Sequence, residues 1–140
     1  MKFAFDGRPW TIGESKETGN ESIAEWVLPG QRVTNWQELV TLQSFWGFQS
    51  KLSLDVYLQR TEAIIQRRCA GASFAVISRS ERDALFETSC PRPDESTLYR
   101  VVFGREAIHI LQYAHKGAPL DAQKKARWLP LLEAAALVDR

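Results

Sequence analysis

The stretch LYRVVFGREAIHILQYAH, Leu98–His115, predicts two antiparallel strands joined by a tight turn at Gly104-Arg105. Apolar side chains fall on both faces of each predicted strand, since neighbours such as Ile110 and Leu111 point to opposite sides. A sheet that is apolar on both faces must be covered on both. The stretch therefore predicts a hairpin inside a sheet that has other elements packed on either side.

The rest of the chain supplies the strands and helices for that arrangement. The predicted fold is a single α+β domain over residues 1–140, an antiparallel sheet of five or more strands flanked by helices as an α/β/α sandwich. The predicted helices are Leu54–Arg68, with Ser53 as N-cap, and Ala122–Val138, with Asp121 as N-cap. The other predicted elements are strands at Trp10–Ser15, Ser22–Leu28, Leu39–Trp46, Ser73–Ser78 and Ala84–Ser89, and a short helical turn at Asn35–Glu38.

The composition is that of one globular domain, with 140 residues, 44% of them hydrophobic and 25% charged. The net charge is +1, so the chain lacks the basic excess of a nucleic-acid-binding protein. No run reaches the roughly 20 apolar residues of a membrane span. The opening MKFAFDGRPW is too short in apolar residues for a signal peptide, so either the protein is cytoplasmic or a leader has been removed.

Two cysteines bear on the compartment. Cys69 ends the first predicted helix and Cys90 follows a predicted strand. A disulfide between them would tie the helix to the sheet and stabilise the fold by roughly 3 kcal/mol on the chain-entropy model. Two buried free thiols are the alternative. Because disulfides persist in oxidising compartments, a bridge would favour a periplasmic or secreted protein over a cytoplasmic one.

The segment EWVLPGQRVTNWQELVTLQSFWG, Glu25–Gly47, contains three of the five tryptophans. Trp36 and Trp46 bracket a predicted strand that also carries the polar residues Thr41 and Gln43. Exposed tryptophans are frequent hot spots in protein interfaces. These four residues are therefore the predicted partner-binding candidates, with burial of the two indoles in the core as the alternative.

Residues with catalytic chemistry are sparse. His109, Tyr113 and His115 fall on one face of the last predicted strand, where they could line the cleft of a small enzyme or ligand-binding protein. Ordinary packing of these side chains is the other interpretation. Two Cys and two His without tight spacing do not predict a metal site. With no nucleophile-elbow motif and no glycine-rich phosphate loop, the sequence predicts no catalytic residues and no cofactor.

The closing pattern resembles that of the PsbP-like fold, which is shared with the Mog family of Ran-binding proteins. It consists of the strand HILQYAHKGAP (His109–Pro119) and the helix sequence KKARWLPLLEAAALV (Lys124–Val138). Three further features resemble a group of small secreted proteobacterial proteins of unknown function. They are VLPGQRVTNWQELVTLQSF (Val27–Phe45), the Cys69 and Cys90 pair, and LYRVVFGREAIHILQYAHKG (Leu98–Gly117).

The resemblance implies a fold used for scaffolding, chaperone and partner-binding roles, and it implies no catalytic residue. The acidic surface associated with Ran binding is absent from this near-neutral chain. The expected function is that of a non-enzymatic accessory protein acting through contact with a protein partner. The alternative is a small-ligand-binding protein or small enzyme with a cleft at His109, Tyr113 and His115.

Overall fold

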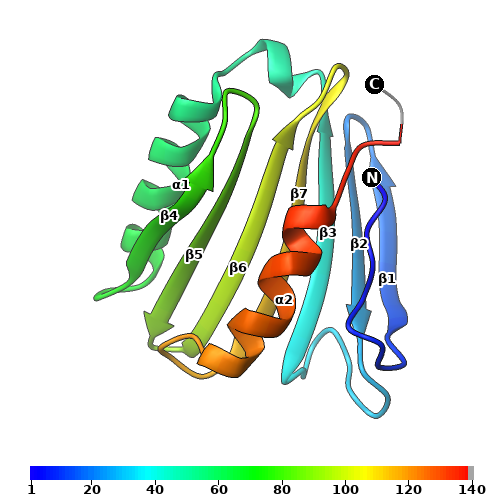
Figure 1. The fold of residues 1–140 in the computed structure, drawn as a ribbon, viewed down its shortest axis with the longest axis vertical. Helices are drawn as coiled ribbons and strands as arrows, with labels where there is room; N and C mark the ends of the chain where they lie inside the picture. Colours follow the sequence, from blue (N-terminus) through cyan, green and yellow to red (C-terminus); the bar gives the residue numbers. More distant parts are fainter. Residues whose placement is uncertain (139–140) are drawn as a thin grey trace.

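Seven antiparallel strands form one sheet with two α-helices, in a computed structural model that describes residues 1–138. The predicted α+β class, with an antiparallel sheet of five or more strands, is confirmed. The strand order is β1-β2-β3-β7-β6-β5-β4 (Figure 1). The elements are β1 (Thr11–Thr18), β2 (Glu21–Val27), β3 (Glu38–Trp46), the 3-10 turn η1 (Phe48–Ser50), α1 (Leu54–Arg68), β4 (Ser73–Arg79), β5 (Asp83–Pro91), β6 (Asp94–Phe103), β7 (Ala107–Lys116) and α2 (Ala122–Ala134).

Two meanders meet at the centre of the sheet. Strands β1 to β3 form the first and β4 to β7 the second, with α1 between them in the chain. Pairing of β3 with β7 joins the two, from Glu38 opposite His115 to Trp46 opposite Ala107. The same pairing places Ser44 opposite His109, although these residues are 65 positions apart in the chain. The middle of the sheet is thus built from segments whose proximity no local pattern reveals.

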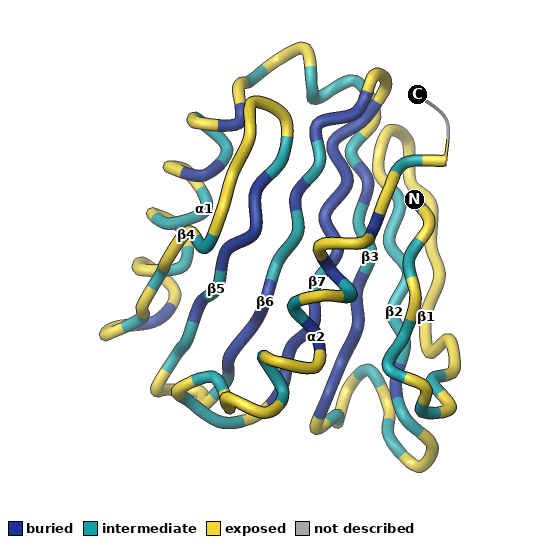
Figure 2. The backbone as a smooth tube through the Cα atoms, in the orientation of Figure 1, coloured by how far each residue is buried: buried dark blue, intermediate teal, exposed yellow. Residues whose placement is uncertain are grey.

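The two helices pack against opposite faces of the sheet. Trp128 of α2 packs in a core with Leu111 of β7, and Leu58 of α1 packs in a second core with Ile110, the next residue back along the strand. Buried residues concentrate in β3, β5, β6 and β7, whereas the edge strand β1 is exposed along its whole length (Figure 2).

The N-terminal ten residues cover the part of the α2 face that the helix leaves open. In Figure 1 this segment runs beside β1 and β2 on the side of α2. Phe3 and Phe5 pack edge-on against Trp26, with ring centroids 5.5 and 5.6 Å apart, and Trp10 meets Trp128 at 5.7 Å. These aromatic contacts extend the core from α2 across to β2.

A hydrogen-bond network fixes this segment to the sheet. Arg8 donates to both oxygens of Glu38, at 2.7 and 2.9 Å, and to Asp6, which also accepts from the Trp10 indole at 2.8 Å. The hydroxyl of Tyr113 donates to Glu38 at 2.5 Å. Burial alone would raise the pKa of Glu38 and of Asp6, but hydrogen bonds, chiefly from Arg8, outweigh it and lower both pKa values.

The first predicted helix and both N-caps are confirmed. Helix α1 has the predicted bounds, and the Ser53 hydroxyl accepts from the Val56 amide at 3.1 Å. Asp121 accepts from two amides in the first turn of α2. Within residues 1–138, neither helix is both long and apolar enough to cross a membrane.

The predicted helical turn at Asn35–Glu38 is wrong. The Asn35 amide donates to the carbonyl oxygen of Arg32 at 2.9 Å, which makes a tight turn before the strand. Glu38 then begins β3, because it pairs with His115 and binds Arg8. Asn35 is a residue type that caps helices well, but asparagine is equally common in turns, and here it closes a turn.

The C-terminal helix is shorter than the predicted Ala122–Val138. Helix α2 ends at Ala134, and Ala135 is extended. Ala136 then exchanges two backbone hydrogen bonds with Lys2, at 2.8 and 3.0 Å. The apolar pattern continues beyond the helix because this extended segment packs against the N-terminal segment.

A disulfide joins Cys69 to Cys90, which is the first of the two alternatives for this pair. Their Cα atoms are 5.9 Å apart, well within bridging distance. The bridge connects the end of α1 to the end of β5 and joins residues that are 21 positions apart in the chain. It reinforces the attachment of α1 to the sheet, where Tyr57 also packs edge-on against Phe86.

Candidate functional site

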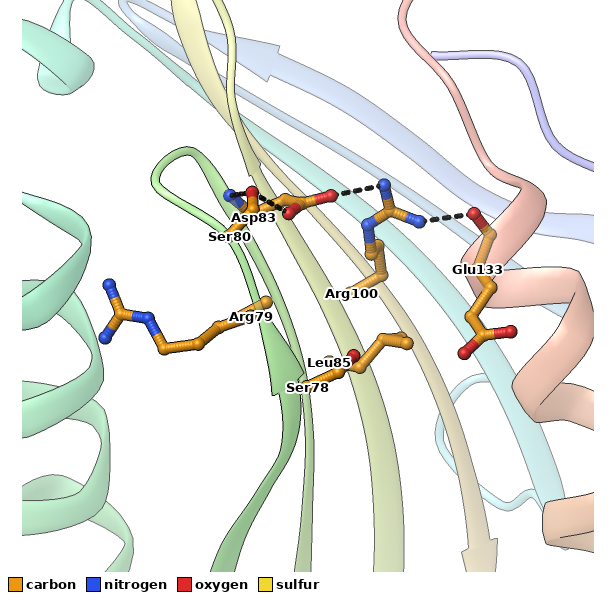
Figure 3. Close-up of a pocket in the computed structure, with 8 residues that line it drawn as sticks. Ser78, Arg79, Ser80, Asp83, Leu85, Arg100 and Glu133 are labelled. Atoms are coloured by element: carbon orange, nitrogen blue, oxygen red, sulfur yellow. Dashed lines mark hydrogen bonds and ion pairs between the residues drawn. The ribbon is translucent and has the colours of Figure 1, made fainter.

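A cavity of about 240 Å³ lies where the hairpin of β4 and β5 meets β6 and the end of α2 (Figure 3). Its central arginine is already engaged. Arg100 donates to Asp83 at 2.7 Å and to the carbonyl oxygens of Leu132 and Glu133 at 2.8 and 2.7 Å. Ser80 also bonds to Asp83. Since the last carbonyls of a helix lack partners within it, Arg100 caps α2, and the cavity is a structural junction.

A larger cavity of about 450 Å³ lies at the far end of β3, beside the turn between β6 and β7. We call it the Trp46 groove. Its walls come from the end of β3, the β6–β7 turn, β7 and the two terminal segments. They consist of Met1, Trp46, Gly104, Arg105, Glu106, His109, Leu137 and Val138.

The backbone around Trp46 is firmly held although its indole is exposed. The Trp46 amide donates to the carbonyl oxygen of Asn20 at 2.7 Å, and the Gly47 amide donates to that of Glu106 at 2.8 Å. Gly47 has a φ of 84°, which glycine adopts without strain, and this turns the chain away from the groove. The Trp46 ring meets His109 edge-on at 5.7 Å and stays 43% exposed. Such an apolar side chain is available to a partner without rearrangement.

His109 forms the base of the groove and is oriented by Ser44. The two residues face each other across β3 and β7, and Ser44 Oγ lies 2.7 Å from His109 Nδ1. Both are buried, with 5% and 9% of their surfaces exposed. Burial, and next the positive charge of the amino terminus, lowers the pKa of His109, so the imidazole is neutral at pH 7.

In this pair, Ser44 fixes the orientation of the His109 ring. Ser44 lies behind His109 and is not part of the groove lining, so a ligand in the groove meets the ring and not the hydroxyl. Among residues 1–138, no carboxylate hydrogen-bonds to the imidazole, as the third member of a triad would. The groove therefore offers an apolar wall with one oriented polar group.

The four predicted partner-binding residues do not form one surface. Trp36 lies before β3, at the opposite end from Trp46, where it is half-buried and stacks under Lys116 with the amine 3.9 Å from the ring centre. Thr41 and Gln43 point to the other face of the sheet from Trp46. Thr41 is only 7% exposed, and Gln43 accepts a hydrogen bond from Gln112 at 3.0 Å. Trp46 alone lines a cavity.

The three residues of the predicted cleft are also separated. Tyr113 is fully buried, stacked on Trp128 at 4.5 Å. His115 is 2% exposed and lies under the start of α2, where its Nε2 accepts from the Asp121 amide at 3.4 Å. They share a face as predicted, but only His109 reaches a cavity. Packing explains the other two.

Several residues of the groove have no signal in the sequence. Arg105, Leu137 and Val138 come from segments that only the fold brings to Trp46. Alternation along the strand places Ser44 and Trp46 on one face, which is the only local hint. Identifying the Ser44–His109 pair requires the register of β3 against β7.

The groove does not present a metal site. In the described part of the chain, no three His, Cys, Asp or Glu side chains lie close enough to hold an ion. The chain matches no protein-family model and no curated protein. The proposal for its function therefore rests on the residues of the Trp46 groove.

Proposed function

We propose that the protein is a non-enzymatic accessory protein that binds a partner polypeptide through the Trp46 groove. The observation that carries this proposal is the exposed indole of Trp46 on the wall of a cavity of about 450 Å³. Tryptophan is the side chain most enriched among interface hot spots. Exposed apolar side chains that gather at one cavity, as Trp46 and Val138 do here, mark interaction sites more often than single ones.

The other walls support an apolar contact. Leu137 and Met1 line the groove, and Val138 at its rim is 68% exposed. A cavity of this size is within the range that holds ligands, about 300–1,000 Å³. A partner side chain that fills it would cover Trp46 and Val138 together. Apolar burial then supplies the affinity, and the polar groups at the base supply the orientation.

Fold and compartment are consistent with this role. One helix on each face of an antiparallel sheet supports an α/β/α sandwich of the PsbP-like type, which implies a partner-binding function. The disulfide between Cys69 and Cys90 supports a periplasmic or secreted protein, because cytosolic disulfides are usually transient. We therefore propose that the partner is met in an oxidising compartment.

The test compares Trp46→Ala with Trp36→Ala. Both variants remove one indole from an end of β3, but only the first changes the groove. Wild type and the two variants are used in parallel pull-downs from the native source, and each captured protein is then purified and titrated against all three. We expect a partner that binds wild type and Trp36→Ala but loses about 2 kcal/mol or more of affinity for Trp46→Ala.

Equal binding of every captured partner to the two variants would contradict the proposal. Circular dichroism of both variants checks that each is folded. Trp46→Ala is expected to keep its fold, because the indole is on the surface and its backbone hydrogen bonds remain.

A further inference from the structure

The imidazole of His109 presents one edge to the groove. Its Nδ1 faces Ser44, while Cδ2, the carbon next to Nε2, lies 3.6 Å from the position a Cβ would take on Gly104, a groove residue. Within residues 1–138, Nε2 has no hydrogen-bond partner in the protein. His109 as a whole is only 9% exposed, but Nε2 itself is not sealed from solvent, so it is open to a ligand in the groove that His109 lines.

Ser44 determines what that atom can do. In the described structure the Ser44 hydroxyl has one acceptor for its proton, Nδ1 of His109. A buried hydroxyl that does not donate is unfavourable, so Nδ1 accepts and the neutral ring carries its proton on Nε2. If the ring is protonated, Nε2 still carries a proton. In both states His109 is a donor toward the groove.

The charges around this donor favour an anion. Arg105 is one of the lining residues, and the amino terminus lies close enough to act on His109 as a positive charge. Among the described residues, Glu106 is the one acidic residue of the lining. Arginine and an imidazole N–H are ordinary partners for a carboxylate, and charge-assisted hydrogen bonds are the stronger ones. Donors and apolar walls therefore share one cavity.

We infer that the Trp46 groove binds the carboxyl terminus of the partner polypeptide, with His109 and Arg105 on the carboxylate and Trp46 on an apolar last side chain. This inference rests on the proposed function. A chain terminus carries a carboxylate and an apolar side chain on the same carbon, which suits a single cavity of about 450 Å³ that combines both kinds of wall. The exposed surface of Val138 at the rim offers contact to the residues that precede the terminus.

The experiment titrates the full-length protein, labelled with ¹⁵N, with four probes. They are an acetylated pentapeptide ending in leucine, the same peptide as its carboxamide, the same peptide ending in aspartate, and 4-methylpentanoic acid. We expect the leucine acid to shift the Trp46 indole and His109 imidazole signals. The amide and the aspartate peptide should bind about tenfold more weakly or worse, since each lacks one of the two features.

Three variants at exposed positions keep the test independent of folding. Arg105→Gln should weaken binding of the leucine peptide acid about five- to tenfold and leave binding of its carboxamide unchanged. Arg60→Gln on α1 should change the binding of neither peptide. Glu106→Gln should strengthen binding of the leucine acid, because it removes the acidic side chain that lines the groove within residues 1–138. The imidazole ¹⁵N spectrum should show His109 protonated at Nε2. A neutral ring protonated at Nδ1 would overturn the donor assignment and the inference with it.

The probes separate this inference from the proposed function. Equal binding of acid and amide, with Trp46 shifted by both, overturns the carboxylate inference and leaves partner binding at Trp46 intact. If 4-methylpentanoic acid binds as tightly as the leucine peptide, the ligand is not a polypeptide terminus and the inference is overturned. It is also overturned if no probe binds at millimolar concentration. The proposed function fails instead if its partner binds Trp46→Ala as well as wild type.

Discussion

At the scale of single residues, one pair of aromatic rings organises the core on the α2 face. Trp128 is 1% exposed, stacks on Tyr113 at 4.5 Å and meets Trp10 edge-on at 5.7 Å. Offset and edge-on aromatic contacts add to the large apolar area that each ring buries. Trp128 therefore lies buried against the sheet, two residues before the proline of α2.

Truncation of this ring should destabilise the fold strongly. Trp128→Ala leaves a large cavity between α2, the sheet and the N-terminal segment, and we expect a loss of about 3–5 kcal/mol in the free energy of unfolding. Denaturant titration measures it, with Trp36→Ala as the half-buried control. A loss below roughly 1 kcal/mol for Trp128→Ala would show that the ring is not packed as described.

The carboxylates of the Arg8 network make stability depend on acidity. Because folding lowers the pKa of Glu38 and Asp6, the unfolded chain binds protons more readily than the folded chain. The stabilisation is therefore complete above the ordinary carboxyl pKa and is lost as the pH falls through the lowered values. Acid should release the N-terminal segment from the sheet.

Glu38→Gln tests this directly. At pH 7 the variant should be less stable than wild type by about 2 kcal/mol, the worth of hydrogen bonds to a charged group. The difference should shrink as the pH falls toward the lowered pKa, since wild type then loses the same charge. Urea titrations at several pH values measure it, with the exposed Glu17→Gln as control. A difference that is unchanged by acid would contradict the role given to the charge.

At the scale of elements, the sequence predicts the bounds of a helix where residues within or next to that helix determine them. Helix α1 has its predicted bounds because Ser53 caps it and Arg67 and Arg68 suit its end. The end of α2 depends on distant partners, since Arg100 caps it and Lys2 pairs with the residues that follow. Its length could not be read from its own apolar pattern.

The disulfide acts at this scale, because it joins α1 to β5. Replacing both cysteines by alanine should cost about 3 kcal/mol, as expected for a loop of 21 residues in the chain-entropy model. Reduction of wild type should lower the unfolding free energy by a similar amount. Mass spectrometry of protein purified without reductant should find no alkylatable thiol, and two free thiols in the folded protein would contradict the bridge.

At the scale of the whole molecule, the candidate site depends on how the two meanders join. The composition and the strand and helix patterns are sufficient to predict an α+β domain with an antiparallel sheet of five or more strands. The Ser44–His109 pair was not predictable, because it depends on strands that lie 65 residues apart in the chain. Of the residues proposed from sequence, Trp46 and His109 meet, since the β3–β7 register makes them diagonal neighbours on one face of the sheet.

The most direct test of partner binding at the groove is site-specific photo-cross-linking in the native organism. A photo-reactive phenylalanine derivative replaces Trp46 in one strain and Trp36 in another. We predict a discrete cross-linked product from position 46, containing one identifiable partner, and none from position 36. Cross-linking from position 36 with none from position 46 would contradict binding through the Trp46 groove, and so would its absence at both.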